Sequence, residues 1–551
     1  MNQKKLFAEF PAVSTEDWEA TIQADLKGAD YEKKLIWKTL EGIAVKPYYR
    51  EADTDGISWL LNNLPGEFPF ARGTKKTDNN WEIRENIYEE DIAAANAAAK
   101  HALERGAEAV CFLYGQNVQS QADFDALVAG LDLSKAYFDF DLPESVNDSE
   151  SITKGLTIKI HSYHNAGANI IQELSIALSA GLEYMNVFTD KGLSAEQAAS
   201  QIVFSISVGS RYFLEIAKIR ALRILWANIL KLYGVTGTAK IHASTSMWNS
   251  TVFDSNVNML RATTEAMSAA IAGADSITVV PYDAVFKKPD EFSCRIARNV
   301  QLLLKNECSF NKIVDPSAGS YYIETLTEQI VSKSLSAFKK LESEGGLLAA
   351  LQNGSIQKSI DESRKQKEKL IMQRREVFIG TNQYPNLQEK MSDKITKKLN
   401  IRRGAEVFET LRLQTEEYAK KNGNAPKVFL WTAGDLAMRL ARATFIKNFF
   451  GCAGYTVIDT NGISDVEEGI ELVKKNDPQI VVLCSKDEEY SGQAKEIFPV
   501  LEKEFPNIIR IVAGNPKDAE DLKAAGAQDF VHVLTNAIES LSSYQKKLGV
   551  A

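Results

Sequence analysis

The feature that most constrains this chain is a repeated alternation of strand-like and helix-like segments between residues 85 and 390. Four short apolar runs read as buried strands, at 109–113, 156–160, 239–243 and 276–280. Segments with apolar residues at helical spacing alternate with them, at 91–105, 170–180, 212–233 and 256–272. Repeated βα units give parallel strands joined by right-handed crossovers. Over a length of about 300 residues, a closed (β/α)8 barrel of the TIM type is the expected fold.

Glycines mark the expected ends of three of these helices. Gly106, Gly181 and Gly234 each follow the last residue of a helical pattern. Glycine is common just past the last helical turn because it adopts a left-handed backbone conformation without strain. The three helices are therefore expected to end at these positions.

The alternation restarts after residue 427. Strands are expected at 427–432, 456–459, 479–484, 508–513 and 530–533. Helices are expected at 435–450, 466–475, 491–504 and 518–525. Five short βα units of this kind indicate an α/β domain of the doubly wound, flavodoxin-like type.

Two further regions lack this alternation. Residues 1–80 form an extended N-terminal arm with a helix near 16–26 and no long periodic element, so the arm is expected to wrap over another surface. Residues 391–426 are charged and helix-prone and end in an Asn-Gly-Asn-Ala-Pro turn, which indicates a linker. The expected organisation is an arm (1–80), a barrel (81–390), a linker (391–426) and a flavodoxin-like domain (427–551).

Composition excludes several classes of protein. The net charge is −9, and no strongly basic cluster stands out, so a nucleic-acid partner is not expected. No run approaches the roughly 20 apolar residues of a membrane span, so no membrane partner is expected either.

The start turns acidic before any leader-like apolar core, and five cysteines without a CxxC pair argue against a disulfide framework. A cytoplasmic location is expected, or an organelle if a leader has been removed.

Motifs for common chemistries are missing from the sequence. There is no GxGxxG after a strand, no GxxxxGK[ST], no HExxH and no GxSxG. His161 and His164 follow a predicted strand and are expected near the barrel mouth, where such a pair could bind metal or transfer protons. No third ligand is visible nearby, and His242, inside a strand, is expected to be a hydrogen-bonded core residue.

Two polar segments of the barrel region have both a functional and a structural interpretation. Residues 315–322 form a dense turn of Pro, Gly and Tyr, which is better explained as a rigid loop than as a ligand contact. Arg295 and Arg298 lie at helical spacing and could bind an anion, but salt bridges within the barrel shell are the simpler interpretation.

These segments also resemble the methylmalonyl-CoA mutase family. The similar runs are LRILWA at 222–227, FSCRIARN at 292–299, VDPSAGSYY at 314–322, GTNQY at 380–384, DLKG at 25–28 and DLKAAGA at 521–527. The resemblance implies adenosylcobalamin held between a barrel and a flavodoxin-like domain, and a radical interconversion of methylmalonyl-CoA and succinyl-CoA. Active members of the family hold cobalt through the His of Asp-x-His-x-x-Gly in the first βα loop of the C-terminal domain.

This sequence departs from the cobalt-binding motif. Alignment on GYTV at 454–457 places Ala437, Arg439 and Arg442 at the Asp, His and Gly of the motif. A guanidinium stays protonated and has no lone pair for a metal. None of the five histidines has an Asp two residues before it. The family's Ser-x-Leu motif is replaced by Ser-Lys-Asp at 485–487, and its Gly-Gly pair is replaced by Ala-Gly at 513–514.

The barrel region also lacks residues that active members of the family carry. Active members carry a substrate-carboxylate Arg in an Arg-Thr-Tyr segment, whereas no Arg lies between Gln116 and Lys159. The tyrosine-containing loop of active members is replaced by residues 81–87. Tyr163 and His164 resemble the catalytic Gly-Tyr-His only if two residues are deleted; without that gap, Ser162 takes the His position.

The resemblance and the losses together predict the non-catalytic small subunit of a heterodimeric methylmalonyl-CoA mutase. No catalytic, cofactor-binding or metal-binding residue is assigned to this chain, and no cofactor is expected on it. Adenosylcobalamin is expected in the partner, the large subunit. Two alternatives remain open: a divergent adenosylcobalamin-dependent acyl-CoA mutase that is active alone, and a regulatory or chaperone-like protein for another mutase. A homodimer is possible in the absence of the partner.

Overall fold

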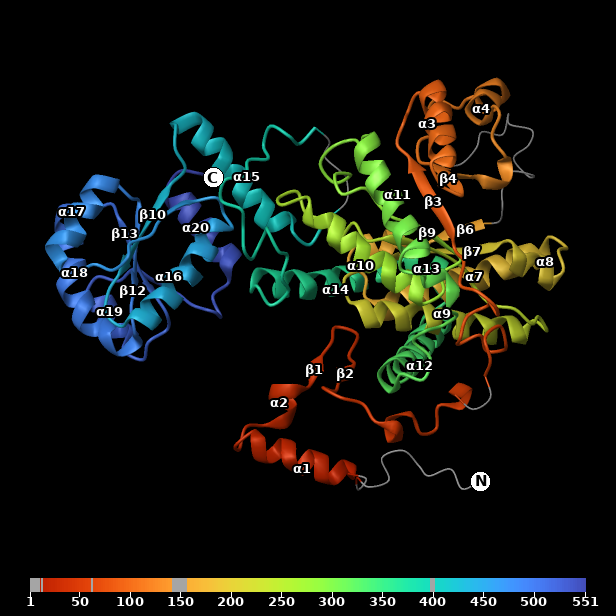
Figure 1. Cartoon of the computed structure of the whole chain (residues 1–551), viewed down its shortest axis with the longest axis horizontal. Helices are drawn as coiled ribbons and strands as arrows, with labels where there is room; N and C mark the ends of the chain where they lie inside the picture. Colours follow the sequence, from red (N-terminus) through yellow and green to blue (C-terminus); the bar gives the residue numbers. More distant parts are fainter. Residues whose placement is uncertain (1–9, 11–12, 61–62, 141–155, 397–401) are drawn as a thin grey trace.

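Two separate parallel β-sheets organise the chain (Figure 1). The computed structural model describes residues 10, 13–60, 63–140, 156–396 and 402–551. One sheet has seven strands and the other five, and a two-stranded antiparallel hairpin belongs to the arm. None of the helices in these ranges combines the length and the apolar character that a membrane crossing requires.

The seven-stranded sheet curls into a barrel. Its strands are β3 (Glu82–Ile87), β4 (Ala109–Phe112), β5 (Ala136–Phe138), β6 (Leu156–Lys159), β7 (Ile202–Val208), β8 (Lys240–Thr245) and β9 (Ser276–Thr278). They pair in parallel in the order β5-β4-β3-β9-β8-β7-β6, so the first strand of the series lies beside the last. This arrangement confirms the TIM-type architecture. The described residues supply seven of the eight expected strands; residues 141–155, between β5 and β6, lie outside them.

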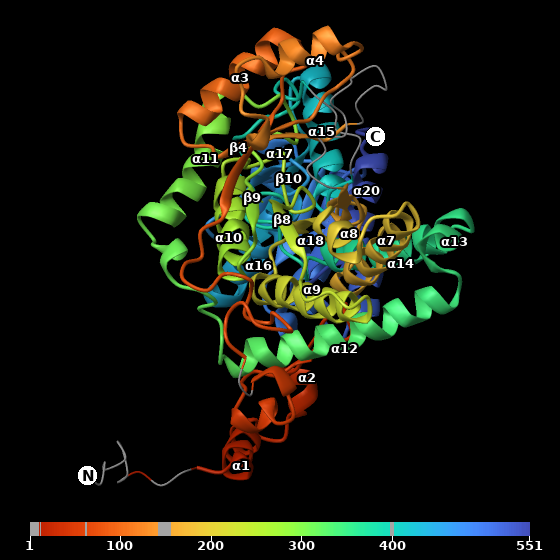
Figure 2. The same cartoon turned by 90° about the vertical axis from the view of Figure 1, so that its right-hand side faces the viewer.

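Helices cover the outside of the barrel (Figure 2). The longer ones are α3 (Ile92–Glu104), α7 (Ile170–Asp190), α9 (Tyr212–Leu232), α10 (Val257–Ile271), α11 (Glu291–Asn306), α12 (Tyr321–Ser343) and α14 (Ser355–Met372). Shorter helices are α4 (Gln121–Val128), α6 (Ile160–Asn165), α8 (Ala195–Ser200) and α13 (Gly346–Gln352). α9 packs against both α10 and α12, and most of its side chains are buried.

Two of the three expected glycine helix ends are confirmed. Gly106 and Gly234 have positive φ just past α3 and α9. The third prediction was wrong, because α7 continues through Gly181 to Asp190. A Cβ at position 181 would lie 2.6 Å from the ring of Trp226 on α9. Glycine is therefore needed there for close packing of α7 on α9, and not for a helix end.

The five-stranded sheet confirms the flavodoxin-like prediction. Its strands are β10 (Lys427–Thr432), β11 (Thr456–Ile458), β12 (Ile480–Cys484), β13 (Ile509–Ala513) and β14 (Asp529–Val531). Their order is β11-β10-β12-β13-β14, and all pairs are parallel. Helices α16 (Leu436–Gly451), α17 (Val466–Asn476), α18 (Tyr490–Glu504), α19 (Ala519–Ala524) and α20 (Ala537–Lys547) flank the sheet.

The first part of the N-terminal arm is exposed, whereas its second part packs on the barrel, where Trp59 is buried beside Ile224 and donates to Glu324. Its hairpin, β1 (Trp37–Lys38) and β2 (Ala44–Val45), places Ile43 and Val45 in the barrel's apolar core. Its helices are α1 (Thr15–Asp25) and α2 (Tyr31–Leu35), and neither has a buried side chain. Figures 1 and 2 show α1 projecting away from the rest of the chain.

A shared apolar cluster joins the barrel to the C-terminal sheet. Trp248 from the loop after β8 packs in the same cluster as Phe378, Phe408 of α15 (Glu406–Asn422), and Phe450 of α16. The segment expected to be a linker thus contributes buried residues to this cluster.

Candidate functional site

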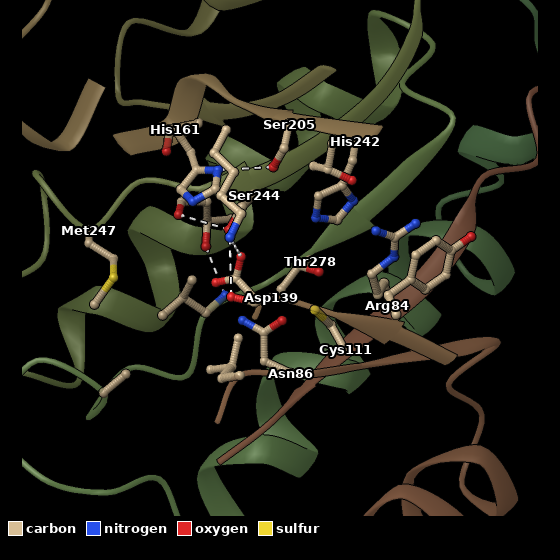
Figure 3. A pocket seen from close by; sticks show the side chains of 18 of the residues that line it. Arg84, Asn86, Cys111, Asp139, His161, Ser205, His242, Ser244, Met247 and Thr278 are labelled. Carbon is tan, nitrogen blue, oxygen red and sulfur yellow. Dashed lines mark hydrogen bonds and ion pairs between the residues drawn. The ribbon is translucent and has the colours of Figure 1, made fainter. Parts of the chain in front are cut away.

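The barrel encloses a cavity of about 280 Å³ at the carboxyl ends of its strands (Figure 3). Side chains two residues apart line it, as expected for the inward face of a strand. Polar members of the lining include Arg84, Asn86, Asp139, Thr157, Lys159, His161, Asn165, Ser205, Ser207, His242, Ser244, Thr245 and Thr278. The interior of a TIM barrel is usually filled by Val, Ile and Leu. A polar lining at these positions marks the cavity as the candidate site.

Strand register arranges the polar groups in two rows. In the row nearer the carboxyl ends of the strands, Thr278 lies opposite both Arg84 and Ser244, and Ser244 lies opposite Ser207. In the row nearer the amino ends, His242 lies opposite both Ser276 and Ser205, and Ser205 lies opposite Lys159. Hydroxyl, imidazole and cationic groups from five neighbouring strands therefore face the same space.

Two histidines of the cavity are held by serine hydroxyls. His161 Nδ1 lies 3.0 Å from Ser205 Oγ, and His242 Nδ1 lies 2.8 Å from Ser276 Oγ. Burial lowers the pKa of His161 and lowers the pKa of His242 well below its usual value. Both rings are therefore neutral near pH 7. The prediction that His242 is a hydrogen-bonded buried residue is confirmed, although its ring also lines the cavity.

His164 does not face this cavity with His161. Its Nδ1 lies 2.8 Å from Glu173 Oε1 and its Nε2 lies 2.8 Å from Ser246 Oγ. The ring is buried, and both of its nitrogens already have partners. Sequence spacing suggested a pair, but the structure brings the two rings into different environments. Within the described ranges, no group of three His, Cys, Asp or Glu side chains is arranged to hold a metal ion.

The charged groups of the cavity are paired. Arg84 donates to Glu82 Oε1 at 3.0 Å, and its guanidinium lies 3.4 Å from the centre of the Tyr137 ring. Lys159 forms an ion pair with Asp139 at 2.7 Å. Each cation therefore has its own carboxylate.

The other predicted polar positions have structural roles, with one exception. Arg298 pairs with Glu85 at 2.7 Å within the barrel shell, as expected. Arg295 is exposed and contacts the Phe292 ring, so a buried salt bridge was the wrong interpretation for that residue. Asp315 accepts from Arg220 and, at 3.3 Å, from Arg72, which supports the rigid-loop interpretation of residues 315–322.

Arg439 occupies a second candidate site, at the carboxyl edge of the C-terminal sheet. It lies in the first turn of α16, directly after β10. Its guanidinium donates to the carbonyl oxygens of Asn461 at 3.3 Å and Gly434 at 3.5 Å. A Cβ at Gly462 would lie 2.7 Å from that guanidinium, so the arginine lies directly over the loop after β11.

Arg442 fills the neighbouring part of the same edge. It pairs with Asp487 at 2.8 Å, in the loop after β12. A Cβ on Gly514, after β13, would lie 3.3 Å from the Arg442 guanidinium. Two of the positions where the sequence departs from the family's motifs, Arg442 and Asp487, are thus joined by an ion pair.

The donor set at the start of α16 does not fit a cobalt ion. A guanidinium carries no free lone pair, and its bonds here are to backbone carbonyls. The C-terminal domain contains a single histidine, His532, which follows β14. Strands β12 and β13 separate β14 from β10, and His532 Nδ1 accepts from the Leu534 amide at 3.3 Å.

Comparisons with known proteins agree on one family. The sequence model of the family described as methylmalonyl-CoA mutase matches residues 38–136 and 146–423. A methylmalonyl-CoA mutase small subunit from Porphyromonas gingivalis is 41% identical over 100% of this chain and 99% of its own length. The small subunit from Streptomyces virginiae is 28% identical over 99% of this chain and 98% of its own.

More distant matches are also found. A methylmalonyl-CoA mutase from Cereibacter sphaeroides is 29% identical over 67% of this chain and 64% of its own length. A solved cobalamin-binding protein from Desulfitobacterium hafniense covers 26% of this chain and 69% of its own, with 21% identity and a TM-score of 0.20, too low to bear on fold or ligand. The family match and the full-length relative identify this chain as a member of the methylmalonyl-CoA mutase family.

Proposed function

We propose that this chain is the non-catalytic small subunit of a methylmalonyl-CoA mutase. In this proposal a large subunit binds adenosylcobalamin and interconverts methylmalonyl-CoA and succinyl-CoA, and this chain stabilises it by association. No residue of this chain is then catalytic, cofactor-binding or metal-binding. The names of its full-length relatives support the small-subunit assignment.

The observation that carries the proposal is Arg439. It stands where the family's cobalt ligand is expected, and its guanidinium is committed to the carbonyls of Asn461 and Gly434. Replacing an imidazole by a guanidinium removes the lone pair that a metal requires. Arg442 and Asp487 add a salt bridge across the same edge, which a bound cofactor would have to break.

The barrel supports the same conclusion. A general acid or base needs one ring nitrogen free to reach the reacting group. Both nitrogens of His164 are bound within the barrel wall, to Glu173 and Ser246. The residue that resembles the family's catalytic histidine is therefore built into the protein's own hydrogen-bond network.

We expect that the purified chain does not bind adenosylcobalamin. Titration of the cofactor with the chain should produce no change in its visible spectrum, and the cofactor should elute separately in gel filtration. The holoenzyme containing the large subunit serves as the positive control. A stoichiometric complex of low-micromolar affinity with the isolated chain would show that the proposal is wrong and would favour a divergent mutase that is active alone.

The N-terminal arm is the part of the chain best suited to contact the partner. Helix α1 buries no side chain within this chain, and Trp18 on it is 48% exposed. Exposed tryptophans at the centre of interfaces are frequent hot spots, whose loss costs about 2 kcal/mol or more. The segment with α1 and α2, which buries no side chain in this chain, is poorly stabilised unless another surface covers it.

Trp18→Ala is therefore expected to weaken a one-to-one complex with the large subunit by at least about tenfold in Kd. The unfolding midpoint of the isolated chain should hardly change, because Trp18 is half exposed and its ring packs on Tyr48, another residue of the arm. Phe292→Ala, at a position 47% exposed on α11, is the matched control and should leave the Kd unchanged. Analytical ultracentrifugation or surface plasmon resonance measures both, and equal affinities for wild type and Trp18→Ala would rule out an arm contact.

A further inference from the structure

We infer that the barrel cavity of this chain binds a small, uncharged, polyhydroxylated molecule. This inference goes beyond the stabilising role proposed above and does not depend on the large subunit. It concerns the space lined by the two polar rows of β3, β6, β7, β8 and β9 (Figure 3).

Two buried polar groups on the cavity have no partner within the described part of the chain. Thr278 Oγ1 has no hydrogen bond, and its residue is 1% exposed. Arg84 Nε likewise has no acceptor, and its residue is 7% exposed. The two residues lie opposite each other on paired strands, so one ligand can reach both. Leaving a buried donor unsatisfied is costly, and native structures seldom do so without a bound molecule or water.

The charge of the cavity argues for an uncharged ligand. Arg84 is balanced by Glu82, and Lys159 is balanced by Asp139. His161 and His242 are neutral because burial lowers their pKa. An ion beside the buried Thr278 and Arg84 would bring an uncompensated charge to the buried end of the cavity, which is unfavourable.

The remaining groups favour hydroxyls over other neutral chemistries. Ser207, Ser244 and Thr278 can each donate or accept a hydrogen bond. The Nδ1 atoms of His161 and His242 are bound to serines, so each ring can offer a ligand Nε2 alone. A ligand whose own groups both donate and accept can satisfy such a lining in any orientation of the hydroxyl hydrogens. Polyols and sugars have this property, whereas an apolar ligand would leave Thr278 and Arg84 without partners.

The size of the cavity agrees with this class. Its volume of about 280 Å³ corresponds to roughly nine water molecules at ~30 Å³ each. A molecule of three to six carbon atoms with a hydroxyl on each carbon fits within that volume.

The test uses the full chain and direct binding. Polyols also raise protein stability by exclusion from the surface, so a thermal shift alone would not identify a site. Saturation-transfer NMR and calorimetry with glycerol, erythritol and myo-inositol, compared with succinate, detect occupancy itself. We expect at least one polyol to bind with one-to-one stoichiometry and succinate not to bind.

Thr278→Val removes one hydroxyl while keeping the shape, and it should weaken polyol binding by about fivefold, the loss expected for one hydrogen bond. Thr381→Val is the matched control and should leave binding unchanged: Thr381 Oγ1 is also buried, has no partner among the residues that the structure describes, and lies outside the cavity lining. Circular dichroism verifies that both variants fold. Absence of polyol binding, equal weakening in both variants, or preferential binding of succinate would each overturn the inference.

Discussion

Replacing Lys218 with methionine is expected to lower the free energy of unfolding by about 3–5 kcal/mol, the cost of breaking a buried ion pair from one side. Lys218 is fully buried, and its ammonium lies 3.0 Å from Glu173 and 2.6 Å from Glu215. It also donates to the carbonyl of Ser207. Without the ammonium, two carboxylates remain in the barrel wall without their main counter-charge.

Chemical denaturation of the isolated chain measures this loss. Lys447→Met is the surface control: Lys447 pairs with Asp459 at 2.7 Å, but both side chains are more than one-third exposed, so the change should cost less than about 1 kcal/mol. Lys218→Met combined with Glu215→Gln should recover part of the loss because it removes one of the two carboxylates. If Lys218→Met were no more destabilising than Lys447→Met, the buried network would contribute nothing to stability.

Stability is also expected to fall between about pH 5 and pH 9 because of Glu265. Burial raises the pKa of Glu265 to about 8, well above its usual value of 4.5. The carboxyl accepts from Asn249 at 3.0 Å and from the Ser246 amide at 3.0 Å, with Glu215 and Arg261 as its charged neighbours. The folded chain therefore holds this proton over a pH range in which the unfolded chain has released it.

The direction of this pH dependence follows from the raised pKa of Glu265. The contribution of the protonated carboxyl to the stability of the folded chain is fully present below pH 4.5 and is lost as the pH rises through about 8. A shift of this size corresponds to a loss on the order of 3–5 kcal/mol. Glu265→Gln keeps a neutral side chain of the same shape. Between pH 5 and pH 9, the free energy of unfolding of this variant should therefore fall by less than that of the wild type, and the difference should equal the loss from Glu265. Parallel denaturation curves for wild type and Glu265→Gln from pH 5 to 9 would contradict a buried, protonated Glu265.

The strands of the C-terminal sheet were predicted more completely than those of the barrel. The three central strands of the C-terminal sheet, β10, β12 and β13, are buried and read as apolar runs, and the bounds of all five strands were predicted within one or two residues. In the barrel, β5 (Ala136–Phe138) and the buried β7 (Ile202–Val208) were missed, and so was β3 (Glu82–Ile87), which reads EIRENI. Arg84 and Asn86 face the cavity, so the polar residues that hid the strand are the ones that make the site.

The candidate site was less predictable because its contacts join distant parts of the chain. The spacing of His161 and His164 suggested a pair at the barrel mouth. The partners that separate them are Ser205, Glu173 and Ser246, which come from three other segments. One available signal was the alternation of polar residues at Ser205 and Ser207 and at His242 and Ser244, because period-two polarity in a parallel strand indicates an inward polar face.

The apolar cluster around Trp248 gives a physical reason for this chain to keep its C-terminal domain, residues 427–551. Trp248, Phe378 and Phe408 are each less than 5% exposed, and they share one apolar cluster with Phe450 and Tyr455 of the C-terminal domain. Truncation before β10 would leave this aromatic surface in water and make the remaining barrel prone to aggregation. Selection for solubility alone is then enough to preserve the domain, whatever ligand its sheet edge once accommodated.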